Sequence, residues 1–132
     1  MSKNLRHSAI YKSGSMKIKA DLPVIVFEED GIFYSYCAPL DLYGYGKTEA
    51  ESKKSFEITL AEFLRYTSNK KTLEKELRRL GWSIKKPKKN VPQYIAPDFS
   101  HLVNQNEDLN RILNDVPNIH KYNQTVRIPA FA

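Results

Sequence analysis

Two strand-forming runs on either side of an Asp-Gly turn constrain the fold of this chain more than any other feature. The first run, VIVF at residues 24–27, is β-branched and aromatic, and the second, residues 32–38, alternates as a strand does. Asp30-Gly31 between them favours a tight turn joining antiparallel strands. Apolar side chains occur on both sides of the second run, so we expect both sheet faces to be covered: Phe33, Ser35 and Cys37 on one, Ile32, Tyr34 and Tyr36 on the other.

Residues 41–46 predict a third strand. Tyr43 and Tyr45 share one face of this strand, and Gly44 and Gly46 share the other. A strand face without side chains lets another element approach closely. The three runs together predict an antiparallel meander with room for a helix against its third strand.

The letters GKT at residues 46–48 raise the question of a phosphate-binding loop. Such a loop needs a glycine five residues before the GKT glycine. That position holds Asp41, whose carboxylate would repel phosphates. The letters fit a helix start better, with Thr48 as the N-cap and Glu51 completing a capping box. An apolar stripe then predicts a helix from Glu49 to about Thr67, with Phe56, Leu60, Phe63 and Leu64 on one face.

Shorter elements are predicted after this helix. Leu73, Leu77 and Leu80 share one face of a second helix that Gly81 closes, and residues 82–84 alternate as a fourth strand. The expected fold class is therefore α+β: a three-strand antiparallel meander plus a fourth strand, packed on one long and one short helix.

The C-terminal part is expected to be a short helical appendage. Asp98 and Asn106 are candidate N-caps of two short amphipathic helices, and residues 124–128 form a candidate last strand. We divide the chain into a flexible N-terminal arm at 1–15, the α+β domain at 16–86, and a basic linker with its appendage of short helices and a final strand at 87–132. Met16 is an alternative to Met1 as the native start.

The order of strands and helix, with FEEDGIFYSYCAPL at residues 27–40 running into GKTEAES at 46–52, resembles the HicB-like antitoxin family. Members of that family combine an acidic Asp-Gly turn, an aromatic-rich strand ending in Pro-Leu, and G-x-T-x-x-E before a long helix. The resemblance covers residues 16 to about 67.

The resemblance implies a partial RNase H-like fold and the role of antitoxin in a type II toxin–antitoxin pair. Such a protein binds and neutralises a small HicA-like mRNA-cleaving toxin and is not itself an enzyme. Members often carry a C-terminal DNA-binding motif, but this chain ends four residues after Ile128, and Arg111 is the one Lys or Arg in its expected short helices. We therefore expect a tail that does not read DNA.

The net charge of +6 is concentrated in one segment. Residues 68–89 hold nine Lys or Arg and two Glu, whereas residues 1–67 hold nine of each sign. Two interpretations stay open: a solvated linker, or a surface that binds phosphates or an acidic partner. The second would use Arg78, Arg79, Lys85, Lys86, Lys88 and Lys89, with Tyr94 as a stacking neighbour.

The ionisable residues do not predict an active site. Glu28, Glu29 and Asp30 are adjacent, so strand alternation separates them instead of gathering them around a metal. His7, His101 and His120 are scattered, and Cys37 falls in an expected buried strand, where cysteine acts as a small hydrophobe. We expect no catalysis, no cofactor and no metal.

Two functions follow from the sequence: an antitoxin with a HicA-like toxin as partner, or a nucleic-acid-binding module acting through residues 78–89. A single cysteine and the lack of a signal-peptide pattern or of a window of about 18 apolar residues predict a cytoplasmic protein without a membrane partner. The open edge of the expected meander favours a homodimer.

Overall fold

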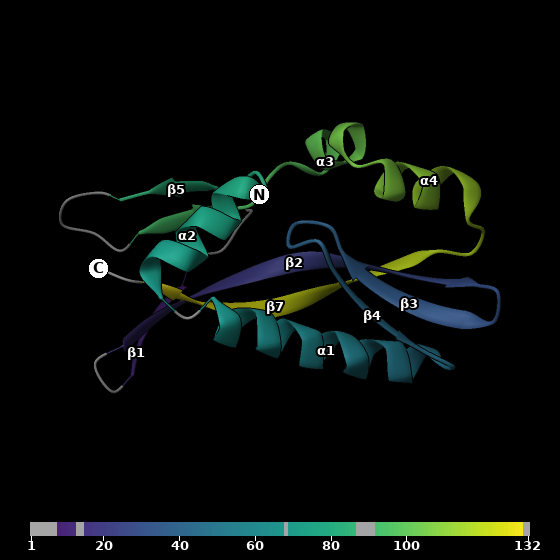
Figure 1. Ribbon diagram of the computed structural model, residues 1–132, viewed down its shortest axis with the longest axis horizontal. Helices are drawn as coiled ribbons and strands as arrows, with labels where there is room; N and C mark the ends of the chain where they lie inside the picture. The colour runs from purple at the N-terminus through teal and green to yellow at the C-terminus, as the bar shows by residue number, and fades with distance from the viewer. Residues whose placement is uncertain (1–7, 13–14, 68, 87–91, 131–132) are drawn as a thin grey trace.

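The computed structural model describes residues 8–12, 15–67, 69–86 and 92–130, and these form an α+β fold (Figure 1). A five-stranded antiparallel sheet and a two-stranded sheet combine with four helices in the described residues. In chain order the elements are β1 (Ser8–Lys12), β2 (Ser15–Glu29), β3 (Ile32–Cys37), β4 (Leu42–Gly46), α1 (Glu49–Tyr66), α2 (Lys70–Arg79), β5 (Ser83–Lys85), β6 (Gln93–Ile95), α3 (Phe99–Gln105), α4 (Glu107–Asp115) and β7 (His120–Ala130).

The 15-residue strand β2 organises the main sheet. β7 pairs antiparallel with its residues 16–26 along one edge. The other edge is shared, because β1 pairs with residues 15–19 and β3 with residues 25–29. β4 then pairs with β3 and completes the predicted meander.

The turn between β2 and β3 has the predicted geometry. Asp30 and Gly31 have φ values of 52° and 79°, the left-handed pair that a two-residue hairpin loop requires. In such a hairpin the closing pair, Glu29 and Ile32, is hydrogen-bonded, so odd-numbered residues of β2 direct their backbone groups toward β3 and β1. The backbone nitrogen of Pro23, which carries no hydrogen, faces this same edge. Because Pro23 lies between the residues paired with β1 and those paired with β3, no hydrogen bond between strands is lost there.

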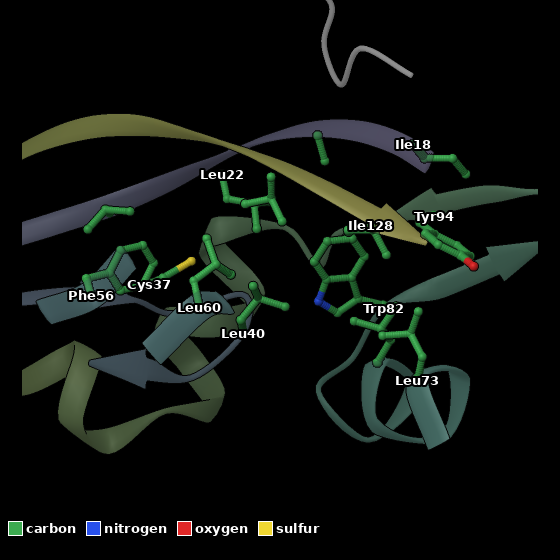
Figure 2. Close-up of a cluster of buried hydrophobic side chains, with 14 residues drawn as sticks. Ile18, Leu22, Cys37, Leu40, Phe56, Leu60, Leu73, Trp82, Tyr94 and Ile128 are labelled. Carbon is green, nitrogen blue, oxygen red and sulfur yellow. The ribbon is translucent and has the colours of Figure 1, made fainter. Parts of the chain in front are cut away.

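Both faces of the main sheet carry a core, as the alternation predicts. On one face, α1 and α2 pack on the sheet around Phe56, Leu73 and Trp82 (Figure 2). On the other, Ile25 and Tyr36 pack against α3 and α4, which lie across the sheet from α1 (Figure 1). Burying apolar side chains on both sides stabilises the sheet by about 25 cal/mol for each Å² removed from water.

The start of α1 follows the predicted capping box with one change of partner. The Thr48 hydroxyl accepts a hydrogen bond from the Glu51 N–H at 3.1 Å. The Glu51 carboxylate accepts from the N–H of Lys47 at 2.9 Å, instead of from the N–H of the cap residue itself.

Three predicted segments differ in the structure. The interval expected to be a flexible arm, 1–15, contains β1, which pairs with the start of β2. The predicted fourth strand at 82–84 is found as β5, and it pairs with β6 in a separate sheet. The last strand, predicted at 124–128, runs from His120 to Ala130 inside the main sheet, so it joins the predicted 16–86 domain instead of forming an appendage to it.

Gly44 is the position where α1 approaches the sheet most closely, as the glycine pattern predicts. A Cβ there would lie 2.2 Å from the Phe56 backbone nitrogen, which cannot move without displacing the helix. We expect Gly44→Ala to lower the free energy of unfolding by about 3 kcal/mol, the upper end of overpacking costs. Urea unfolding measures this.

Gly31→Ala provides the matched control. Nothing lies within 4 Å of a Cβ at Gly31, but its φ is +79°, so the substitution costs only the left-handed strain of about 1 kcal/mol. Equal losses for the two variants would contradict the close approach of α1.

Candidate functional site

The described basic residues that the sequence singles out lie at the C-terminal ends of α2 and β5. Arg78 and Arg79 end α2, whereas Lys85 ends β5 and Lys86 follows it. Lys88 and Lys89 lie outside the described residues. Tyr94, the expected stacking neighbour, is buried in the core and donates its hydroxyl to the Pro129 carbonyl at 2.9 Å, so it is not exposed for stacking.

Acidic residues of the same segment neutralise part of this charge. The Lys86 ammonium lies 2.6 Å from a Glu74 carboxylate oxygen. Arg79 donates to Glu76 from its Nε at 2.9 Å, and this hydrogen bond lowers the pKa of Glu76. Within the described part of the segment, Arg78 and Lys85 are exposed and have no ion pair. The described part of the predicted cluster thus consists of two unpaired cations and two ion pairs.

An apolar groove lies on the outer side of α1, next to β4. Its volume is about 760 Å³, and its lining comes from Leu42, Thr59, Glu62, Phe63, Arg65 and Tyr66. Thr59, Glu62, Phe63 and Tyr66 are spaced at i, i+3, i+4 and i+7, which puts these four on one face of α1. Tyr66 is 84% exposed, so a large aromatic side chain stands in solvent beside the groove.

The groove borders an edge strand of the main sheet. β4 pairs with β3 and with no other strand in the described residues. The Tyr45 N–H donates to the Ser55 hydroxyl of α1 at 3.1 Å, and the Tyr45 side chain is 66% exposed. An edge strand with a neighbouring apolar groove is a surface on which another chain can pack.

A polar cluster joins the sheet to α4. The buried Tyr36 hydroxyl donates to Asp41 at 2.8 Å and accepts from the Asn106 side-chain amide at 2.7 Å. Burial, together with the Asp41 hydrogen bond, raises the pKa of Tyr36. The Asn106 oxygen meanwhile accepts from the Leu109 N–H at 3.0 Å and caps α4, as predicted. The cluster therefore fixes α4 onto the sheet.

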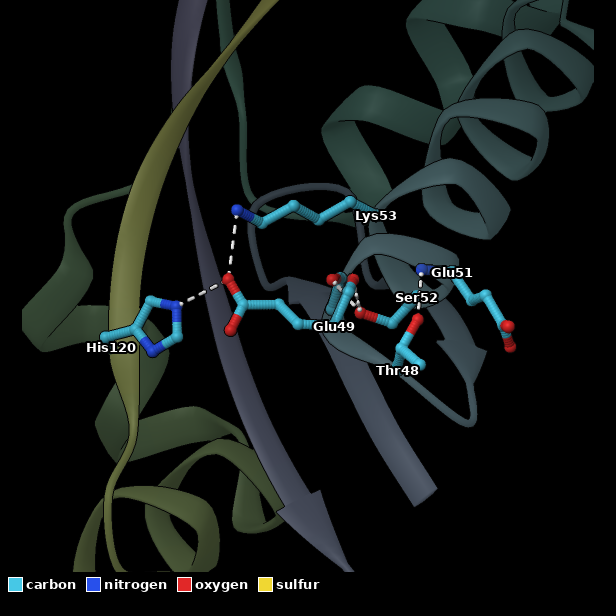
Figure 3. Close-up of polar contacts among 7 residues, drawn as sticks. Thr48, Glu49, Glu51, Ser52, Lys53 and His120 are labelled. Atoms are coloured by element: carbon cyan, nitrogen blue, oxygen red, sulfur yellow. Dashed lines mark hydrogen bonds and ion pairs between the residues drawn. The ribbon is translucent and has the colours of Figure 1, made fainter. Parts of the chain in front are cut away.

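His120 belongs to a surface ion-pair network (Figure 3). Its Nε2 lies 3.0 Å from a carboxylate oxygen of Glu49, which also pairs with Lys53 at 3.1 Å, and these two partners lower the pKa of Glu49. The nearby Ser52 hydroxyl donates to the Glu49 backbone carbonyl at 2.8 Å and shares a hydrogen bond with Ser35. The His120–Glu49 contact connects β7 to α1. The Ser52 hydroxyl bonds to Glu49 and Ser35 and not to the His120 ring.

The remaining nucleophile and metal candidates are not assembled into a site. Cys37 is fully buried, and burial raises the pKa of its thiol to about 12, so the thiol is protonated at neutral pH. Among the described residues, no three His, Cys, Asp or Glu side chains are grouped to hold a metal. His101 is exposed on α3, and His7 lies outside the described residues.

Sequence reasoning missed the groove and the polar cluster. Phe63 packs against the core, as its place in the apolar stripe predicts, and also lines the groove, whereas Tyr66, one turn further, is exposed. Tyr36 and Asn106 are 70 residues apart, so their contact follows from tertiary packing alone.

No protein-family model, curated protein sequence or solved structure matches the chain. In the part of the chain that the structure describes, the helices are too short or too polar to span a membrane.

Tyr36→Phe tests the polar cluster. Removing the hydroxyl leaves Asp41 and Asn106 without their shared partner, and we expect a loss of about 2 kcal/mol in the free energy of unfolding. Tyr66→Phe, at an exposed hydroxyl, is the control and should change it by less than about 0.5 kcal/mol. Urea denaturation of both variants measures this, and equal effects would contradict a role of the cluster in holding α4.

A pH dependence follows from Tyr43, which stacks on Tyr36 with ring centroids 4.1 Å apart. Burial and the nearby Asp108 raise the pKa of Tyr43 to about 12. The unfolded chain releases this proton near pH 10, so stability is lost as the pH rises from about 10 to 12. Because Tyr43 is partly exposed, we expect this loss to be only about 1 kcal/mol.

Thermal or urea unfolding between pH 9 and 12 measures the effect. The Tyr43→Phe variant should lose less stability than the wild type over this range. Parallel curves for the two proteins would show that Tyr43 titrates as in the unfolded chain.

Proposed function

We propose that this chain is a HicB-like antitoxin, a non-catalytic protein that binds and neutralises a small HicA-like mRNA-cleaving toxin. The groove of about 760 Å³ between α1 and β4, with the exposed Tyr66 at its side, is the observation that carries the proposal. The toxin would pack on this groove and on the adjoining β4 edge.

The resemblance and the groove fall on the same part of the fold. The residues that resemble the family, 16 to about 67, form β2, β3, β4 and α1, which follow one another in the chain and pack together. Gly44 and Gly46 bring the N-terminal half of α1 against β4. The groove lies further along the same helix, between its C-terminal half and Leu42 of β4. The surface offered to a partner thus comes from the segment that carries the resemblance.

The local charge also suits an RNA-binding, basic partner. Although the whole chain has a net charge of +6, α1 has four Glu and three Lys or Arg, a net charge of −1. Glu62 lines the groove, and Glu57 lies on an exposed face of the same helix. Complementary charge steers association, so a basic toxin would approach α1 more readily than the basic end formed by α2 and β5.

The alternative function, a nucleic-acid-binding module acting through residues 78–89, is less well supported. Lys86 and Arg79 pair with Glu74 and Glu76, and Tyr94 is buried. Arg79 and Lys86 could bind phosphate only by breaking those pairs, which leaves Arg78 and Lys85 as the unpaired cations in the described part of the predicted set. We therefore keep the antitoxin as the principal proposal.

Co-purification tests the function. The chain, expressed with its flanking reading frames, should retain a small basic protein through a high-salt wash, because an apolar interface does not weaken with salt as phosphate contacts do. The same small protein should stop growth when it is expressed alone. Retention of no protein, or of one that is harmless alone, would refute the proposal.

Tyr66→Arg tests the groove as the binding surface. Replacing this exposed aromatic side chain of the groove with a charged one should weaken toxin binding by about 30-fold, the cost of a hot-spot residue. Isothermal titration calorimetry with the co-purified toxin measures this. Ile58→Arg is the matched control, because Ile58 is 56% exposed on the same helix but does not line the groove. Equal weakening by both variants would place the interface elsewhere.

A further inference from the structure

One end of the main sheet presents a polar face that no described helix covers. α3 and α4 pack on this face only where Ile25 and Phe27 lie. Toward Met16 the same face continues with side chains that are exposed or, for Lys19, partly buried: Lys17, Lys19 and Asp21 from β2, and Asn123, Thr125 and Arg127 from β7. The alternate residues, Ile18, Ala20 and Leu22, are buried on the opposite face. We call this uncovered surface the β2–β7 face.

Two cations of the β2–β7 face stand directly opposite each other. Lys19 pairs with Arg127 across the two strands. The hairpin register makes this a non-hydrogen-bonded pair, in which the Cα atoms approach to about 4.5 Å. Like charges in directly opposite positions destabilise a sheet. Repulsion between Lys19 and Arg127 therefore lowers the stability of the sheet, and the fold itself does not require two cations at these positions.

This cost is not relieved by a carboxylate of the described residues. Within the described residues, Lys17, Lys19 and Arg127 form no ion pair. The acidic residue on this face, Asp21, accepts a hydrogen bond from the Thr125 hydroxyl at 2.8 Å. The α2–β5 segment differs, because Glu74 and Glu76 neutralise two of its cations. Three unneutralised cations thus lie together on a part of the sheet where the sequence shows no basic run.

We propose that the β2–β7 face binds the phosphate backbone of single-stranded nucleic acid. Lys17 and Lys19 are two residues apart on one strand, about 6.7 Å, and Arg127 lies beside Lys19 in a second row. Cations in rows on an exposed sheet face suit an extended polyanion, whereas a free phosphate ion needs an enclosing pocket. None of the described residues that form this uncovered face is aromatic and available for base stacking, so we expect binding to be independent of base sequence.

Fluorescence anisotropy with labelled 20-nucleotide RNA and DNA strands of mixed sequence tests the proposal. Three phosphate contacts on single-stranded nucleic acid predict a slope of about −2 for the logarithm of the binding constant against the logarithm of salt concentration. The triple variant Lys17→Gln, Lys19→Gln, Arg127→Gln should abolish most of this slope. The single variant Lys19→Gln should reduce it by about 0.7.

The matched control removes the same charge from helices. Lys54→Gln, Lys71→Gln, Lys75→Gln changes three exposed lysines of α1 and α2, so any effect of net charge is equal in the two triple variants. A wild-type slope near zero, or equal loss in both triples, would overturn the proposal. A duplex that binds more tightly than either single strand would also contradict it.

Thermal unfolding separates binding from folding. If Lys19 and Arg127 repel each other, the Lys19→Gln variant should unfold at the same temperature as the wild type or a higher one, while it binds nucleic acid less tightly. A variant that unfolds at a clearly lower temperature would show that Lys19 stabilises the sheet, which contradicts the proposed cost. This outcome is independent of whether a toxin binds the α1–β4 groove.

Discussion

The pairing of β2 with partners on both of its edges holds the rest of the molecule in place. β7 covers residues 16–26 of one edge, and β1 and β3 divide the other edge between them. Because β2 is so long, its two halves carry different cores. The half that pairs with β3 is covered on both faces. The other half is covered by α2 and Trp82 on one face, and no helix of the described residues covers the β2–β7 face.

The two proposed surfaces depend on this division. The groove for a toxin lies beside β4 and α1, which the meander positions through Gly44. The phosphate-binding surface lies on the uncovered half of β2 with β7. A protein partner and a nucleic acid would therefore contact separate elements, and binding of one leaves the other surface free.

The sequence predicts the elements whose signals are local and misses the contacts between distant segments. The Asp30-Gly31 turn, the Thr48 cap and the glycine face of β4 each follow from a few adjacent residues, and the structure contains all three. The position of β7 in the main sheet does not follow from adjacent residues. Its pairing with β2 joins segments about a hundred residues apart, and its exposed alternate positions are polar. The basic residues of segment 78–89 favour a phosphate site in the sequence, but the ion pairs of Arg79 and Lys86 form only in the folded chain.

Hydrogen–deuterium exchange on the complex with the co-purified protein tests the central claim most directly. If the chain is an antitoxin that uses the α1–β4 groove, amides of β4 and of the C-terminal half of α1 should gain protection, and those of β7 should exchange as in the free chain. Protection confined to β7, or to the α2–β5 segment, would contradict this account of the binding surface.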